Sequence, residues 1–262
     1  MGADGGPGVT YTAARAALRT ALRVTSRHQW TGQAHVPREG GCVVVSNHLS
    51  HADPLPLADF LDAAGRYPRF LGKAELFDVR IMGRLLRNVG QIPVQRESEH
   101  AGVALSAAVD AVRSGECVVV YPEGTLTRDP ELWPMVGKTG AARIWWQTRC
   151  PVIPVAQWGP HELLAPYGRV PQVWRRPVMK VTAGPALTLS TEEPPHYQEL
   201  TGEIMASLSA LLASVRGVSA PTSVFDPRAS DLPRTGNPRK NRPHGQSPNR
   251  EGMAGPDDEG TA

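Results

Sequence analysis

The side chains best suited to chemistry in this sequence are a histidine and a carboxylate five residues apart, His48 and Asp53. In a turn that follows a strand, the carboxylate can hold one imidazole nitrogen, which fixes the tautomer and makes the other nitrogen a better base. Such a base can take the proton of an alcohol that attacks a thioester, an effect worth about 10²–10⁴ in rate. Taken alone, the pair is explained better as a turn histidine and an aspartate that stabilises a helix N-terminus.

The same turn contains a second histidine, so His48, His51 and Asp53 could also serve as three ligands of a hydrolytic metal. Metal sites usually take further ligands from elsewhere in a fold. The remaining histidines are not paired and none follows a convincing buried strand: His28, His35, His100, His161, His196 and His244. The sequence therefore favours a site without a metal.

A second group of residues could bind a phosphate. Pro122–Thr125 contains Gly124, which lets the backbone approach a ligand and expose N–H groups to an anion, and Thr125 adds a hydroxyl donor. Arg96 can hold a phosphate through two hydrogen bonds, and Glu123 would pair with a base such as Arg96 or orient a substrate hydroxyl. Each of these residues, taken singly, is explained better as part of an ordinary turn or strand end.

Short apolar runs predict the strands that position these residues: 41–46, 91–94, 116–121, 152–155 and 178–183. Helical spacing predicts helices between and after them, at 57–64, 81–88, 102–113, 140–147 and 196–215. Continuous valine runs indicate strands covered on both faces, and strands that alternate with helices indicate a largely parallel sheet. The predicted fold class is α/β, a single domain with a largely parallel mixed sheet covered by helices. Its site would lie beyond the carboxyl ends of the strands, where the reactive residues occur.

The two ends of the chain differ in pattern from this domain. Residues 10–27 predict an amphipathic helix with an Ala- and Leu-rich face opposite Arg15, Arg19, Arg23 and Arg27, which suits either a membrane interface or an ordinary surface helix. From Gly217 onward, Pro recurs among polar residues, which predicts a disordered tail. The expected organisation is an N-terminal segment 1–36, a domain 37–216 and a tail 217–262.

Composition excludes several classes of protein. The net charge of +3 does not indicate a nucleic-acid-binding protein, although residues 66–96 are locally basic and suit anionic head groups. The three cysteines lack paired spacing, which favours a reducing, cytoplasmic setting. We find no secretory signal and no apolar run near the roughly 18 residues that span a bilayer. We therefore expect contact with a membrane from one side only.

Four ordered blocks together resemble a known family: Asn47-His48-x4-Asp53, Gly90-x-Ile-Pro-Val-x-Arg96, Tyr121-Pro-Glu-Gly-Thr125 and Val152-Ile-Pro154. They are similar to those of the glycerolipid acyltransferases with a His-x4-Asp motif, most of all the 1-acyl-sn-glycerol-3-phosphate acyltransferases. Lys138-x-Gly140-Ala-Ala-Arg143 is also similar, and the resemblance covers about residues 36–189. In one departure, Leu126 stands where many members have Arg, with Arg128 two residues further on. In the family this region touches the head group of the acceptor.

The resemblance implies a glycerol-3-phosphate acyltransferase-like fold and assigns roles to matching residues. His48 would be the general base and Asp53 would orient it, while Pro154 would shape the acyl-donor side. Residues that would bind substrate are Asn47, Gly90, Arg96, Glu123, Gly124, Thr125 and Lys138. The family uses no metal and no cofactor, only an acyl-CoA or acyl carrier protein thioester as co-substrate.

The implied activity is phosphatidic acid synthesis from a lysophospholipid acceptor, in phospholipid biosynthesis. Expected partners are the acceptor, the acyl thioester donor and a membrane surface, but no nucleic acid. Acyl carrier protein is one of the two carriers expected for the donor. The expected location is the cytoplasmic face of the plasma membrane, as a peripheral or monotopic protein. Two alternatives stay open: the same chemistry on another lysolipid or glycolipid acceptor, and a non-catalytic lipid- or CoA-binding protein.

Overall fold

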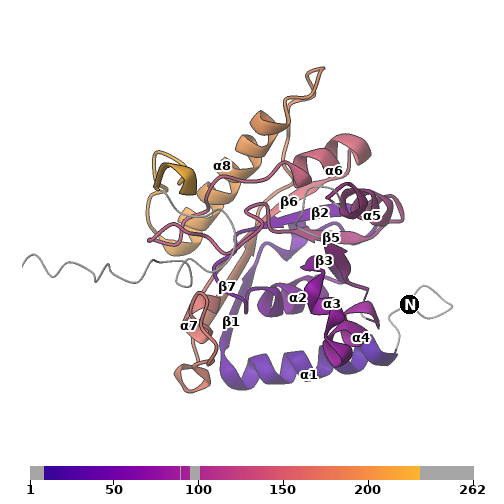
Figure 1. The fold of residues 1–262 in the computed structure, drawn as a ribbon. Helices are drawn as coiled ribbons and strands as arrows, with labels where there is room; N and C mark the ends of the chain where they lie inside the picture. The colour runs from indigo at the N-terminus through magenta and orange to yellow at the C-terminus, as the bar shows by residue number, and fades with distance from the viewer. Residues whose placement is uncertain (1–8, 89, 95–100, 231–262) are drawn as a thin grey trace, which may run out of the picture.

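The computed structural model describes residues 9–88, 90–94 and 101–230, which form a mixed seven-stranded sheet with helices on both faces (Figure 1). The strand order is β1-β7-β6-β2-β5-β3-β4, and every neighbouring pair is parallel except β6 and β7. The strands are β1 (Arg27–Thr31), β2 (Cys42–Ser46), β3 (Pro68–Lys73), β4 (Ile92–Val94), β5 (Cys117–Val120), β6 (Val152–Trp158) and β7 (Val178–Ala183). The predicted α/β class with a largely parallel sheet is confirmed.

Helices follow most strands, as the alternating pattern predicts. The α-helices are α1 (Val9–Thr25), α2 (Pro54–Ala63), α3 (Glu75–Asp78), α4 (Arg80–Asn88), α5 (Ala101–Arg113), α6 (Gly140–Thr148), α7 (Pro160–Leu163) and α8 (Tyr197–Arg216). Short 3-10 helices are η1 (Gln33–His35), η2 (Val173–Arg175) and η3 (Pro227–Ser230). Helices α5, α6 and α8 cover one face of the sheet, whereas α2 covers the other and α1 packs outside α2 (Figure 1).

The valine runs explain why the centre of the sheet is the core. Val43 and Val45 of β2 pack among side chains of α5, α6 and α8, while Val44 packs against α2. All five residues of β2 are buried, as are all four of β5. The expectation that these strands are covered on both faces is confirmed, and it fixes the carboxyl ends of β2 and β5 side by side.

Two strands were not predicted, and one changes the domain boundary. β1 and β3 have few β-branched residues and no continuous apolar run, so neither carries the usual sequence signal of a strand. β1 nevertheless pairs with β7 at the sheet edge, with Arg27 opposite Val178. The predicted separation of residues 1–36 from the domain is therefore wrong, because part of this segment completes the sheet.

The predicted start of the tail at Gly217 is also wrong. Residues after α8 return to the domain, where Met135 and Phe225 form a parallel β-bridge and the Val136 N–H donates to the Phe225 carbonyl at 3.0 Å. Ala220 packs against the small apolar cluster around Trp133. Ordered structure thus extends to residue 230, and residues 231–262 lie outside the described residues.

Helix α1 packs on its own domain, with part of its predicted apolar face and two of its arginines turned inward. Leu22 is buried, but Arg15 and Arg19 also turn inward and form ion pairs with α2: Arg15 Nε lies 2.7 Å from Asp62, and Arg19 lies 2.9 Å from both Asp59 and Asp62. Two of the four arginines of the predicted basic face are therefore neutralised by buried aspartates of α2. Among the described residues, no helix combines the length and the hydropathy that crossing a bilayer requires.

The basic surface predicted for residues 66–96 is largely absent at its N-terminal end. Arg66 is buried and its guanidinium donates to the carbonyls of Pro37, Gly40 and Gly115 at 2.6, 2.7 and 3.0 Å. Arg69 pairs with Glu116 at 2.7 Å. These arginines hold loops at the edge of the sheet rather than face a ligand.

Candidate active site

His48 and Asp53 are in direct contact, as their spacing predicts. His48 Nδ1 lies 2.8 Å from Asp53 Oδ2, and Asp53 has no exposed surface. The same carboxylate oxygen accepts the backbone N–H groups of Leu49 and Ser50. Because a carboxylate oxygen only accepts hydrogen bonds, the contact with Oδ2 assigns the hydrogen to Nδ1, and Nε2 is left with the lone pair that a base needs.

Asp53 does not play the simpler role of a helix cap. It occupies the N-cap position of α2, yet its side chain makes no cap hydrogen bond. Instead the carboxylate turns back toward the loop that carries His48. The geometry therefore matches the base-and-orienter interpretation of this pair rather than the capped-turn interpretation.

The loop that carries His48 is fixed to the segment after β5 on several sides. Glu123 Oε1 accepts the His48 N–H at 2.9 Å and Oε2 accepts the Met135 N–H at 3.2 Å. The Thr127 N–H donates to the His48 carbonyl at 2.7 Å. The Tyr121 ring stacks on the imidazole with ring centres 4.2 Å apart and planes 18° apart. The base is therefore held through its backbone, its Nδ1 and one ring face.

Glu123 is a structural acid rather than the predicted substrate-binding residue. Its side chain is buried, and both oxygens are occupied by backbone donors. Burial raises the pKa of its carboxyl from 4.5 to about 8, while the hydrogen bonds from His48 and Met135 oppose that rise. Glu123 thus supports the loop that carries His48 from behind. Its carboxylate binds backbone N–H groups, not the glycerol phosphate that was predicted as its partner.

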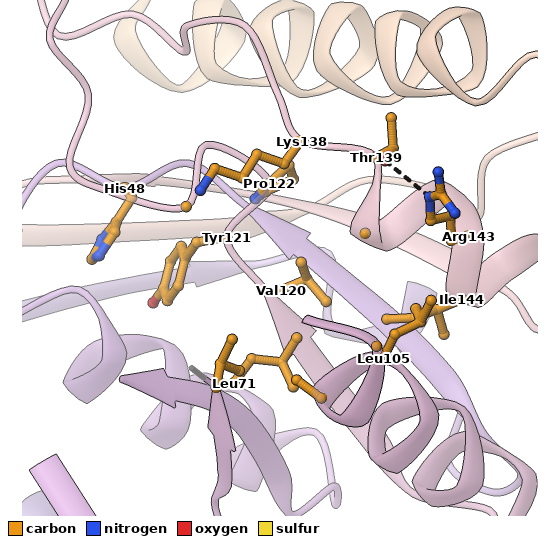
Figure 2. A pocket seen from close by; sticks show the side chains of 15 residues that line it. His48, Leu71, Leu105, Val120, Tyr121, Pro122, Lys138, Thr139, Arg143 and Ile144 are labelled. Carbon is orange, nitrogen blue, oxygen red and sulfur yellow. Dashed lines mark hydrogen bonds between the residues drawn. The ribbon is translucent and has the colours of Figure 1, made fainter. Parts of the chain in front are cut away.

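His48 and Gly124 open onto one cavity of about 440 Å³, so the candidate base and the turn after β5 share a cleft. A volume of this size lies within the usual range for ligand pockets. Its apolar wall is formed mainly by Leu71, Val94, Leu105, Val120 and Ile144 (Figure 2). A cavity with this lining suits a hydrocarbon chain that ends near the imidazole.

Two cations line the other side of the cavity, Lys138 and Arg143 (Figure 2). The Lys138 side chain lies across Gly124, where an added Cβ would come within 2.9 Å of the lysine Cε, and Gly124 has a φ of 68°. Arg143 Nε lies 3.1 Å from Thr139 Oγ1, and its guanidinium stacks over Tyr197. Gly140, the first residue of α6, also lines the cavity, so the positive end of that helix faces it.

The cations and the N-terminus of α6 together make this side of the cavity suitable for an anion such as a phosphate. The predicted role of Lys138 is consistent with this position. Gly124 contributes differently from the prediction, because its N–H donates to the Tyr121 carbonyl at 2.9 Å and closes the turn. Its lack of a side chain, rather than its N–H, makes room for Lys138.

Three other residues predicted to contact substrate have structural positions. The buried Asn47 amide exchanges two hydrogen bonds with the Gln157 backbone, at 3.0 and 2.8 Å, and ties the end of β2 to β6. Pro154 lies inside β6 opposite Val45 and does not line the cavity. Thr125 is buried and is also absent from the lining. The substrate-binding roles predicted for these three are not matched by their positions.

The second predicted block contributes little to the described site. Gly90 has a φ of 74° and lies beside the Arg69 side chain, away from the cavity lining. Arg96 lies outside the described residues. The site therefore includes from this block only Val94, at the carboxyl end of β4.

The prediction missed Tyr121 and Arg143 as members of the site. Tyr121 directly precedes the Pro122–Thr125 turn, and Arg143 lies one helical turn after Thr139, so both were within quoted motifs. Burial raises the pKa of the Tyr121 hydroxyl well above its usual value, and the Asp53 charge adds to that rise. Tyr121 therefore stays neutral and serves as a flat apolar surface for the imidazole.

The rival metal site gains no support from the side chains that the structure describes. Within residues 9–88, 90–94 and 101–230, no three His, Cys, Asp or Glu side chains are grouped so as to hold a metal ion. His51 instead packs edge to face on Tyr167, with ring centres 6.1 Å apart. His48 and Asp53 are engaged with each other.

Comparison with known proteins identifies relatives of this chain. A chloroplastic 1-acyl-sn-glycerol-3-phosphate acyltransferase of Brassica napus, BAT2, is 31% identical over 124 residues, which cover 47% of this chain and 34% of the relative. The 1-acyl-sn-glycerol-3-phosphate acyltransferase of Bacillus subtilis is 26% identical over 147 residues, which cover 55% of this chain and 69% of the relative. The chain thus spans only about a third of the length of the Brassica relative.

A solved structure supports the fold. The 1-acyl-sn-glycerophosphate acyltransferase from Thermotoga maritima superimposes with a TM-score of 0.56 at 21% identity, over 77% of this chain and 83% of that chain. The family model described as Acyltransferase matches residues 27–158, about half of the chain, from β1 to the end of β6. This match includes His48, Asp53 and the cavity that His48 lines, and the chain belongs to the acyltransferase family.

Proposed function

We propose that this chain is an O-acyltransferase that moves a fatty acyl group from a thioester to the sn-2 hydroxyl of 1-acylglycerol 3-phosphate and produces phosphatidic acid. The observation that carries the proposal is the His48–Asp53 contact of 2.8 Å at the mouth of a cavity with one apolar and one cationic side. The names of the relatives support the same activity. The donor would be acyl-CoA or acyl carrier protein.

The residues suggest a direct transfer without a covalent enzyme intermediate. His48 Nε2 takes the proton of the acceptor hydroxyl as its oxygen attacks the thioester carbonyl carbon. The tetrahedral intermediate collapses, the carbon–sulfur bond breaks, and the imidazolium returns the proton to the leaving thiolate. The buried Asp53 carboxylate stabilises the imidazolium between these steps, as general base catalysis requires.

The two sides of the cavity would bind different parts of the substrates. Lys138, Arg143 and the N-terminus of α6 would hold the acceptor phosphate, since two cations and the positive end of a helix line the cavity. The apolar wall would accommodate an acyl chain. This division places the acceptor hydroxyl between the phosphate and the chain, next to His48.

One observation favours a second acceptor. Leu126, which stands where many similar proteins have Arg, is buried and does not line the cavity, and the buried Arg128 does not line it either. The cavity therefore lacks a cation from this turn, and a lysolipid with another head group is the alternative acceptor.

An assay with several different acceptor lipids separates these two functions. Purified protein is incubated with labelled acyl-CoA and, separately, with lysophosphatidic acid, other lysophospholipids and a glycolipid, and the lipid products are identified by mass spectrometry. We expect phosphatidic acid as the main product, with full activity in excess chelator. Acylation of another acceptor with none of lysophosphatidic acid would support the second function, and donor binding without transfer to any acceptor would indicate a non-catalytic binding protein.

The lipid acceptor also suggests where the protein works. A lysophospholipid with a long acyl chain resides in a bilayer, so we propose a peripheral or monotopic association with the cytoplasmic face of the plasma membrane. Flotation of the protein with vesicles is the direct measurement, and failure to float with any vesicle that contains the acceptor would contradict this location.

A further inference from the structure

Exposed apolar side chains lie where the C-terminal end of α1 meets the segment after α7. We call this region, residues 23–27 and 164–176, the α1–η2 corner. Val170 and Trp174 are each 71% exposed, and Val24 is 66% exposed. The two segments are joined, because Arg176 donates to the Arg23 carbonyl at 3.1 Å. Figure 1 shows the segment after α7 beside this end of α1. A large aromatic side chain this exposed is a typical sign of an interaction surface.

The charge at the α1–η2 corner has one sign. Five exposed arginines surround the apolar side chains: Arg23, Arg27, Arg169, Arg175 and Arg176. None forms an ion pair within the part of the chain that the structure describes. Residues 9–31 contain no acidic residue, and residues 160–178 contain only Glu162. Tryptophan with surrounding arginines is the composition that favours the head-group region of an anionic bilayer.

The outer face of α1 extends this surface without adding charge. Because Arg15 and Arg19 pair with Asp62 and Asp59, they do not project from that face. The exposed residues along it are small and uncharged: Thr12, Ala13, Ala16, Ala17, Thr20 and Ala21. A flat face of this kind can lie along a membrane, with the charged and aromatic corner at its end.

The α1–η2 corner is bonded to the loop that carries the catalytic base. Ser50 Oγ donates to the Leu164 carbonyl at 2.6 Å, and His51 packs on Tyr167. Ser50 lies two residues after His48 in the chain. Contact between this corner and a bilayer would therefore bring the base close to the lipid surface.

We propose that the α1–η2 corner docks on the surface of an anionic lipid bilayer, with Trp174 and Val170 among the head groups. The inference rests on the proposed function, and it differs from the basic surface predicted at residues 66–96. The α1–η2 corner would be the surface through which the protein contacts the bilayer that contains its lipid substrate.

The test is flotation of the full chain with vesicles of phosphatidylcholine, with and without phosphatidylglycerol. We expect binding that requires the anionic lipid and weakens with salt. Arg169→Ser with Arg175→Ser should weaken binding about 10- to 30-fold at low salt, because each arginine near an anionic surface strengthens binding by about a factor of 3 to 5. Trp174→Ser should weaken it about tenfold.

Matched controls come from other faces. Arg80→Ser with Arg84→Ser removes two exposed arginines of α4, and Val103→Ser removes a valine that is 69% exposed on α5. Both controls should bind vesicles like the wild type, and all variants should keep the wild-type thermal unfolding midpoint. Loss of binding in the α4 variant, or wild-type binding after the changes at Arg169, Arg175 and Trp174, would overturn the proposal.

Two further outcomes separate this proposal from others. The corner variants should still acylate a lysolipid that is kept below its critical micelle concentration. If the wild type acylates no lysolipid, but the corner variants lose the vesicle binding that the wild type shows, the proposed function is refuted and the docking site is supported. Conversely, the wild type could form a dimer in sedimentation velocity that Trp174→Ser abolishes, and bind no vesicles. This result would show that the corner binds a second copy of the chain and would refute docking on a bilayer.

Discussion

Glu123→Gln should change how the stability of the fold depends on pH, because the Glu123 carboxyl is buried. The Glu123 carboxyl has a pKa of about 8 in the fold, against 4.5 in the unfolded chain, because burial disfavours its charge. Below about pH 4.5 both states are protonated. As the pH rises from there to about 8, the unfolded chain releases a proton that the fold retains, so stability falls across this window.

The size of this loss follows from the two pKa values. Each pH unit between them corresponds to about 1.4 kcal/mol, which gives at most about 5 kcal/mol over the window. The hydrogen bonds from His48 and Met135 favour the charged form, and the pKa of about 8 already includes their effect. Glutamine does not titrate, so the variant should lack this slope. It should also be less stable by about 1–3 kcal/mol at pH 5, since its NH₂ group would face one of the two backbone donors.

The assay is urea unfolding followed by circular dichroism at several pH values from 5 to 9. We expect the stability lead of the wild type over Glu123→Gln at pH 5 to shrink as the pH rises and to reverse by about pH 8, because the wild type loses about 4 kcal/mol over those three pH units. Glu39→Gln is the control, because Glu39 is exposed to water in the fold as it is in the unfolded chain; its curve should run parallel to that of the wild type. Parallel curves for Glu123→Gln as well would show that the buried acid does not retain its proton.

Three further substitutions test the site. Asp53→Asn removes the charge that stabilises the imidazolium, so kcat should fall about 10²–10⁴-fold; a kcat within twofold of wild type in a steady-state assay would refute the orienting role. Gly124→Ala places a Cβ within 2.9 Å of the Lys138 side chain and should raise the KM for the phosphorylated acceptor more than the KM for the donor; equal changes in both would argue against phosphate binding there. Tyr121→Leu removes the ring that stacks on the base and should lower kcat about 2- to 10-fold, whereas Tyr121→Phe should retain it; the idea fails if both behave alike in kcat.

The centre of the fold was predictable from sequence because its strands are continuous valine runs. A run such as Cys42–Ser46 has no polar face, so it requires cover on both sides, and the chemistry-bearing residues follow it directly. β1, at one edge of the sheet, and β3, between β5 and β4, were not predictable in this way. β1 and β3 lie outside the central strands and take their conformation from pairing with β7 and β5, a tertiary effect that local sequence does not carry.

The dyad was predictable from spacing, while the roles of its neighbours were not. His48 and Asp53 are close in sequence, so their contact needs only a local turn. Glu123 is 75 residues from His48, and only the register of β2 beside β5 shows that its carboxylate meets a backbone N–H. A motif identifies residues that matter but does not distinguish a group that touches substrate from one that holds the loop.

Helix α1 shows the same limit for surfaces. Its arginine stripe predicts a charged outer face, but Asp59 and Asp62 of α2 draw two of the arginines inward. Exposed arginines next to this end of α1 also come from residues 169–176, which are distant in sequence. Pairing partners, rather than periodicity, decided which face of this helix meets water.

The account depends most on His48 as the base, and one measurement tests it directly. Product formation from labelled acyl-CoA and the preferred acceptor is followed by mass spectrometry for wild type, His48→Ala and His51→Ala, together with equilibrium binding of the donor. We predict that His48→Ala loses about 10²–10⁴ in turnover and keeps wild-type donor affinity, while His51→Ala, whose ring packs on Tyr167, keeps both. Undiminished turnover in His48→Ala would contradict the account.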